Sequence, residues 1–326
     1  MGGRGLVCLC TVLAAASAAA ADAVLDRLAR MAEAMRVRNY SGVFVYRHGD
    51  EVETLRIVHR HRDGRVDERL LTLSGEPREV LRDARGVRCI LPDKRLVLID
   101  HRASETRFPG VVPADLDRLP QHYRLELADA PERIAGRLSD RIDIAPRDAY
   151  RYGYRLWVDR EWDLLTRSDV LDGERVVEQV MFTELMVHDQ IPDAWFEPQW
   201  LRPGYREKRL DAGDGDDGPP PLSWRAERLP PGFGLILRDA RWRPRSGRPV
   251  EHLLFSDGMA TVSVFIEPGD GVRRGARLDG HRRRGALSLY GRRLGDWRIV
   301  VLGDVPPQAV ERFAEALVPA EAGGAP

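Results

Sequence analysis

Two closely spaced histidines and a run of three arginines have the types and spacing best suited to ligand chemistry. His59 and His61 alternate along a strand-like segment, so they share one face and are two of the ligands that a metal ion needs. No third ligand accompanies them, and no metal site is predicted. Arg282, Arg283 and Arg284 suit two-pronged recognition of a carboxylate or phosphate group, which makes them candidates for contacting a partner. A solvated surface loop is an equally good interpretation of these arginines.

The motifs that usually carry catalysis are missing. The sequence lacks the Gly-x-Ser-x-Gly nucleophile elbow, a phosphate-binding glycine-rich loop after a strand, and the His-Glu-x-x-His zinc motif. Cys89 lies in the alternating segment 87–91, which predicts a buried position where a thiol behaves as a small apolar group. We therefore expect a protein that is not an enzyme, with no catalytic residues and no cofactor.

The charge balance and the N-terminus point to an exported protein. The chain has 51 basic and 51 acidic residues, and this zero net charge argues against a nucleic-acid binder. Residues 1–21 resemble a cleaved signal peptide, because Arg4 precedes an apolar stretch and an Ala-x-Ala sequence stands at 18–20. Removing it leaves Cys89 as the single cysteine, so no intramolecular disulfide is expected.

The elements that must position these side chains are mainly short strands. Residues 23–37 carry an apolar stripe at helical spacing, and this predicts a helix. Strands are predicted at 40–46, 54–60, 68–73, 87–91, 96–100, 137–145, 151–159, 165–171 and 176–185. Turn residues separate them, which indicates an antiparallel meander. The interval 104–120 is expected to be a loop or to contain a short helix at 114–118.

A segment rich in Asp, Gly and Pro divides the chain. It covers 210–222 and has the composition of a linker, so we predict a first domain at 22–209, a second at 223–318, and a flexible tail at 319–326. The second domain carries 17 arginines against 11 acidic residues. A hairpin is expected at 252–268, with Asp257 and Gly258 in its turn for reasons of backbone geometry. A helix is expected at 306–317.

Four stretches, together spanning most of the chain, resemble the RseB/MucB family of periplasmic regulators of the envelope-stress sigma factor. They are NYSGVFVY at 39–46 with ETLRIVH at 53–59, LSGEPREV at 73–80, YRLWVD at 154–159, and LFSDGMATVSVFI at 254–266 with GDVPP at 303–307. The resemblance implies a mostly antiparallel α+β fold. Its first domain would be an open β-barrel similar to lipoprotein carriers, and its second a smaller α+β domain.

The resemblance also implies a function. Members bind the periplasmic domain of a membrane-spanning anti-sigma factor, protect it from regulated proteolysis, and release it on binding lipopolysaccharide or related lipid. A periplasmic lipid or lipoprotein carrier is the alternative, and an envelope hydrolase is a third reading. Self-association into a homo-oligomer is left open. Pattern alone suggests six residues that line a lipid-binding interior, without deciding which sheet face points inward: Phe44, Tyr46, Leu71, Leu73, Tyr152 and Tyr154.

Overall fold

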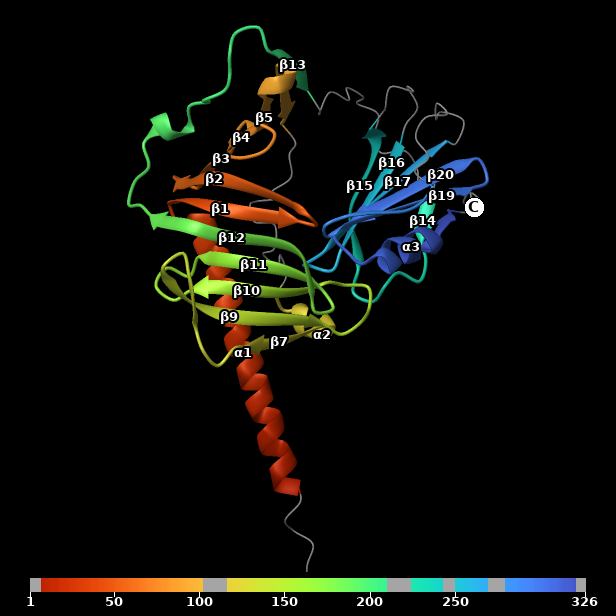
Figure 1. Cartoon of the computed structure of the whole chain (residues 1–326). Helices are drawn as coiled ribbons and strands as arrows, with labels where there is room; N and C mark the ends of the chain where they lie inside the picture. Colours follow the sequence, from red (N-terminus) through yellow and green to blue (C-terminus); the bar gives the residue numbers. More distant parts are fainter. Residues whose placement is uncertain (1–6, 102–115, 210–223, 243–249, 269–278, 321–326) are drawn as a thin grey trace, which may run out of the picture.

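The first part of the chain folds into one large curved sheet (Figure 1). The computed structural model describes residues 7–101, 116–209, 224–242, 250–268 and 279–320. The large sheet consists of β1 (Tyr40–His48), β2 (Glu51–Arg62), β3 (Arg65–Thr72), β4 (Glu79–Asp83), β5 (Gly86–Leu91), β6 (Leu96–Asp100), β7 (Tyr123–Leu127), β8 (Glu132–Ile134), β9 (Arg137–Pro146), β10 (Gly153–Asp159), β11 (Leu165–Asp172), β12 (Arg175–Val187) and β13 (Arg206–Arg209).

The order of the strands shows how the sheet is built and where it stays open. It runs β13-β6-β5-β4-β3-β2-β1-β12-β11-β10-β9-β7, with β8 also paired to β9. Every pairing is antiparallel except that of β13 with β6. Within the described residues β13 and β7 are the two ends and do not pair with each other, so the sheet does not close into a barrel. The mostly antiparallel β architecture with few helices is confirmed.

The long helix α1 (Val7–Val37) crosses one face of this sheet and supplies its core (Figure 1). Val24, Leu28, Met31 and Met35 recur at spacings of three and four, so they lie on one side of the helix. All four are buried in the same cluster as apolar side chains from β1, β2 and β9 to β12. The helix predicted at 23–37 is therefore confirmed. In the described part of the chain, no helix combines the length and hydropathy that a membrane span requires.

The second part of the chain forms a smaller sheet with one helix packed on it. Its order is β15-β16-β17-β20-β19-β18, and the helix α3 (Pro307–Ala316) buries Val310 and Phe313 against it. A two-stranded sheet of β14 and β21 adjoins it. The strands are β14 (Trp224–Ala226), β15 (Gly234–Trp242), β16 (Val250–Ser256), β17 (Thr261–Pro268), β18 (Gly280–Arg284), β19 (Leu287–Leu294), β20 (Trp297–Gly303) and β21 (Leu317–Pro319).

Several elements of the structure differ from those that the sequence predicts. The arginines at 282–284 lie in strand β18, where they pair with β19, and not in a loop. Strands β4, β7, β8 and β13 were not predicted, because they are short, charged and held by backbone pairing. The helix near 114–118 is α2 (Leu119–His122), a few residues later. Strand β21 includes Pro319, the first residue of the predicted tail, and residues 321–326 lie outside the described residues. The predicted linker at 210–222 lies outside the described residues.

Candidate functional site

Four of the six predicted lipid-lining residues come together in the interior of the large sheet. Phe44, Tyr152 and Tyr154 are buried in the core cluster that α1 completes, and Tyr46 packs against it. The ring of Phe44 lies 5.5 Å from that of Phe182, centroid to centroid. This interior is apolar, and side chains of α1 occupy much of it.

Leu71 and Leu73 are not brought to this interior. In the register of β2 with β3, Ile57 faces Leu70 and Leu55 faces Thr72, so Leu70 points inward with Ile57. Leu71 therefore points to the opposite face, and Leu73 shares that side because successive side chains alternate. Leu71 is buried there, whereas Leu73 is 43% exposed.

The two domains meet at a buried ion pair, which the sequence did not reveal. Asp257, in the turn between β16 and β17, accepts a hydrogen bond at Oδ2 from Nε of Arg151 at 2.6 Å and from the hydroxyl of Tyr123 at 3.0 Å. Both charged side chains are fully buried. The Arg151 guanidinium also donates to the carboxylate of Asp148 and the carbonyl oxygen of Pro231, and it lies 4.9 Å from the centre of the Phe233 ring.

The other oxygen of Asp257 serves its own turn. Its Oδ1 accepts hydrogen bonds from the backbone N–H groups of Met259 at 2.9 Å and Ala260 at 2.8 Å. The turn geometry that the sequence predicts for Asp257 accounts for only one of its two carboxylate oxygens. A buried partner more than a hundred residues away in the chain leaves no local signal, so this role could not be predicted from the sequence.

The β18–β19 hairpin forms a second bridge between the domains. Arg283 donates to Asp172 at 2.8 Å, and Arg284 to Glu51 at 2.5 Å. The guanidinium of Arg283 also lies 5.6 Å from the centre of the Tyr152 ring. Ala286 and Met259 of the second domain are buried in the core cluster of the first. We call the contacts of Asp257 with Arg151 and of this hairpin with β2, β11 and Tyr152 the domain junction.

Two carboxyl groups near the domain junction, one from each domain, are shifted toward their neutral forms. Burial and the charge of Asp304 raise the pKa of Glu178 to about 7, although a hydrogen bond with Tyr46 opposes the shift. Desolvation also raises the pKa of Asp304, which keeps some solvent-exposed surface. Burial, followed by the negative charge of Glu178, raises the pKa of Tyr46. The first domain thus presents a protonatable group to the second.

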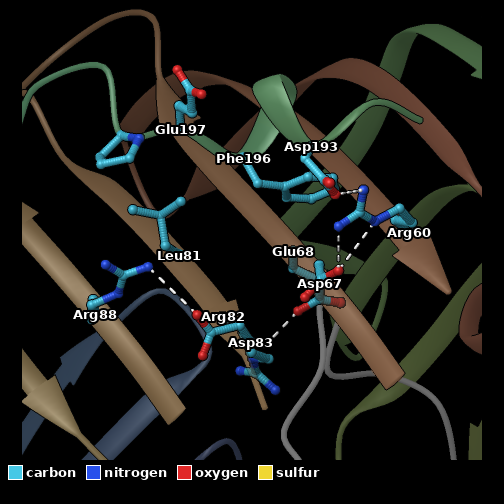
Figure 2. Close-up of a pocket in the computed structure, with 11 residues that line it drawn as sticks. Arg60, Asp67, Glu68, Leu81, Arg82, Asp83, Arg88, Asp193, Phe196 and Glu197 are labelled. Atoms are coloured by element: carbon cyan, nitrogen blue, oxygen red, sulfur yellow. Dashed lines mark hydrogen bonds and ion pairs between the residues drawn. The ribbon is translucent and has the colours of Figure 1, made fainter. Parts of the chain in front are cut away.

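A charged pocket of about 320 Å³ lies on the large sheet, under the chain that follows β12 (Figure 2). Figure 2 shows the guanidinium of Arg60 between two carboxylates, with Nη2 2.7 Å from Asp67 and Nη1 2.6 Å from Asp193. Two further pairs line it, Arg82 with Glu68 at 3.3 Å and Arg88 with Asp83 at 3.5 Å. An acyl chain bound here would remove these charged groups from water, so the pocket suits a lipid tail poorly.

The side chains of His59 and Cys89 lie in surroundings that suit a structural role and not a reactive one. His59 is completely buried, with Nδ1 3.1 Å from Glu68 Oε1 and Nε2 3.2 Å from the backbone oxygen of Arg36. Both ring nitrogens are therefore engaged in linking β2 to β3 and α1. Cys89 is only half-buried, contrary to the core position expected, and burial raises the pKa of its thiol. A raised pKa disfavours the reactive thiolate.

Comparisons with known proteins match nearly the whole chain. Residues 23–200 match the family model of the MucB/RseB N-terminal domain, and residues 219–318 that of the MucB/RseB C-terminal domain. The chain is 34% identical to the sigma factor AlgU regulatory protein MucB of Pseudomonas aeruginosa, over 96% of each chain. It is 28% identical to the sigma-E factor regulatory protein RseB of Escherichia coli, over 94% of this chain and 93% of that protein.

Solved structures agree with these matches. The crystal structure of MucB in complex with MucA(peri) has a TM-score of 0.69 and 29% identity, and the match covers 92% of this chain and 100% of that one. A crystal structure of MucB has a TM-score of 0.63 and 28% identity, with 92% and 98% covered.

Proposed function

The chain belongs to the MucB/RseB family, and we propose that it regulates an alternative sigma factor by binding the periplasmic part of a membrane-spanning anti-sigma factor. The observation that carries the proposal is the match of both family domains, in order, over nearly the whole chain. The prediction that the chain is not an enzyme is confirmed, because its matched relatives are sigma factor regulatory proteins.

The location follows from the same proposal. The bound segment of the partner lies in the periplasm, so the regulator acts there after export and removal of residues 1–21. Occupancy shields the partner from the protease that begins its destruction, and the sigma factor stays sequestered. Arg282, Arg283 and Arg284 remain predicted partner contacts. Arg283 and Arg284 also bond Asp172 and Glu51 of the first domain. A partner that binds these arginines therefore competes with contacts of the domain junction.

Lipid binding releases the partner in this proposal, by way of the sheet interior. Tyr46, Tyr152 and Tyr154 lie in the same cluster as Met259 and Ala286, which come from the second domain. An acyl chain that enters among these tyrosines therefore competes with the contacts that join the domains. A ligand shifts an equilibrium only by preferring one state, and the preferred state here is the one with a loosened domain junction.

Calorimetry with the exported form of the protein, residues 22–326, tests this function. The recombinant periplasmic part of the organism's anti-sigma factor is titrated into it without lipid, and then with lipopolysaccharide added. We expect saturable binding that lipid weakens. Lack of binding in lipid-free buffer would refute the proposal. Lipid uptake without partner binding would instead favour a carrier.

A further inference from the structure

Strand β15 forms an edge of the second-domain sheet that exposes three consecutive apolar side chains. It pairs with β16 on one side, and no strand in the described part of the chain pairs with its other side. Leu235, Ile236 and Leu237 are 50%, 60% and 47% exposed. The backbone N–H and C=O groups on the free side of an edge strand are the natural partners of another extended chain.

The edge strands β18, β13 and β7 expose charged side chains, whereas β15 exposes three consecutive apolar ones. Strand β18, at the opposite edge of the same sheet, exposes arginines at 282–284. Strand β13 consists of four exposed charged residues, 206–209, and β7 exposes Arg124 and Glu126 beside one apolar residue, Leu127. Charged side chains on an edge oppose the addition of a further strand. The apolar edge at β15 lacks this protection over 235–237.

An irregularity in the pairing places apolar side chains on both faces of this edge. Leu235 lies opposite Phe255 and Leu237 opposite Leu254, with Ile236 bulged between them. Phe255 is buried in the core beneath the sheet, whereas Leu254 is only half-buried. Opposite residues of an antiparallel pair share a face, so Leu235 and Leu237 lie on different faces. An added strand would thus cover apolar surface on both sides.

The sequence that follows the apolar edge indicates the charge of its occupant. In the sequence, 235–237 is followed by arginines at 238, 241, 243, 245 and 248, with Asp239 the single acidic residue of that segment. Arg238 already pairs with Glu251 of β16 at 3.1 Å. The surplus of positive charge favours an occupant whose apolar residues are followed or preceded by acidic ones.

We infer that the free edge of β15 binds an extended apolar segment, flanked by acidic residues, of the anti-sigma factor's periplasmic part, which adds to the sheet as a further strand. The inference rests on the proposed function, because it identifies where that partner binds. Backbone hydrogen bonds to β15 supply the register, and Leu235, Ile236 and Leu237 supply the buried apolar contact.

Two measurements on the exported form of the protein test the inference. The first is calorimetric titration of the anti-sigma factor's periplasmic part into the wild type, Ile236→Arg, and the control Met186→Arg. Met186 is 54% exposed on β12 of the first domain, so it matches Ile236 in exposure but lies away from β15. We expect Ile236→Arg to weaken binding roughly tenfold or more, and Met186→Arg to leave it unchanged. The melting temperature of each variant verifies its fold.

The second measurement, amide hydrogen exchange of the wild type with and without the partner, requires no substitution. Partner-dependent protection at 235–238 is expected. Unchanged exchange there, or equal affinity of Ile236→Arg and wild type, would overturn the inference and leave the proposed function standing. A wild type that does not bind the partner would overturn both. Partner-independent dimerisation that Ile236→Arg abolishes would assign the edge to a second copy of the chain instead.

Discussion

Oδ2 of Asp257 lies 2.6 Å from Nε of Arg151, and neither side chain has exposed surface. The two residues belong to different domains, so this pair fixes how the domains meet. A buried ion pair adds little net stability, because removing both charges from water offsets their attraction. Removing only one partner is costly, since the remaining charge stays buried without compensation. The pair therefore makes the relative position of the domains specific.

Replacing Asp257 by Asn should destabilise the protein by about 3–5 kcal/mol, because Arg151 loses its buried counter-charge. Chemical denaturation measures this loss, and small-angle scattering should show a larger radius of gyration as the domains separate. Asp148→Asn serves as the control, since Asp148 also bonds Arg151 but is 25% exposed at its side chain. Equal stability of the Asp257→Asn variant and the wild type would contradict a structural role for the pair.

Glu178 should make the protein less stable as the pH rises. Its pKa of about 7 in the folded protein exceeds the ordinary value of 4.5, so folding favours the protonated group. This stabilisation is complete below pH 4.5 and is lost as the pH rises through 7. Glu178→Gln should therefore raise the melting temperature at pH 8, by about 2–4 °C for each 1 kcal/mol that remains after solvent screening.

The pH prediction is checked by thermal unfolding at pH 4 and pH 8. At pH 4 the Glu178→Gln variant and the wild type should melt together, because the glutamate is then neutral. Glu184→Gln is the matched control, as Glu184 lies on the same strand β12 but is exposed. A similar gain from Glu184→Gln would assign the effect to general surface charge.

Reversing the charge of Arg282 should weaken binding of the anti-sigma segment severalfold and reduce its dependence on salt. The contacts with Asp172 and Glu51 are made by Arg283 and Arg284, so reversing the charge of Arg282 leaves both contacts in place. Titrations at two salt concentrations measure both effects. Arg225→Glu, at a 53% exposed position in β14, is the control. An unchanged affinity and an unchanged salt dependence would indicate that Arg282 is a solvated surface residue that does not contact the partner.

Lipid should compensate for a cavity in the interior of the large sheet. Phe44→Ala removes a buried ring and should cost about 3–5 kcal/mol without lipid. If an acyl chain fills the space, short-chain lipid should restore part of that loss in a thermal melt. Leu73→Ala, on the other face of the sheet, should cost less than about 0.5 kcal/mol and show no lipid-dependent recovery. Equal responses of the two variants would place the lipid elsewhere.

The sequence predicted those features whose cause is local. The helix at 23–37, the long strands of the first domain and the helix at 306–317 follow from apolar periodicity, and the structure confirms them. The inward face of β3 was not decidable, because Leu70 and Leu71 are equally apolar neighbours and only the register with β2 separates them. Asp257 was missed because its partner is distant in the chain. Contacts between segments distant in the chain, and not the local propensity of the sequence, determine the inward face of β3 and the role of Asp257.

The strand pairing at the centre of the large sheet determines when the protein can fold. Strand β1 lies between β2 and β12, and Ser41 bonds His188 across 147 residues at 2.8 Å. A chain that emerges N-terminus first therefore leaves one edge of β1 unpaired until residues near 187 have emerged. Folding of the first domain is slow on this account, since distant ends must meet before the sheet is continuous. During that interval the unpaired edge and its apolar side chains are open to aggregation.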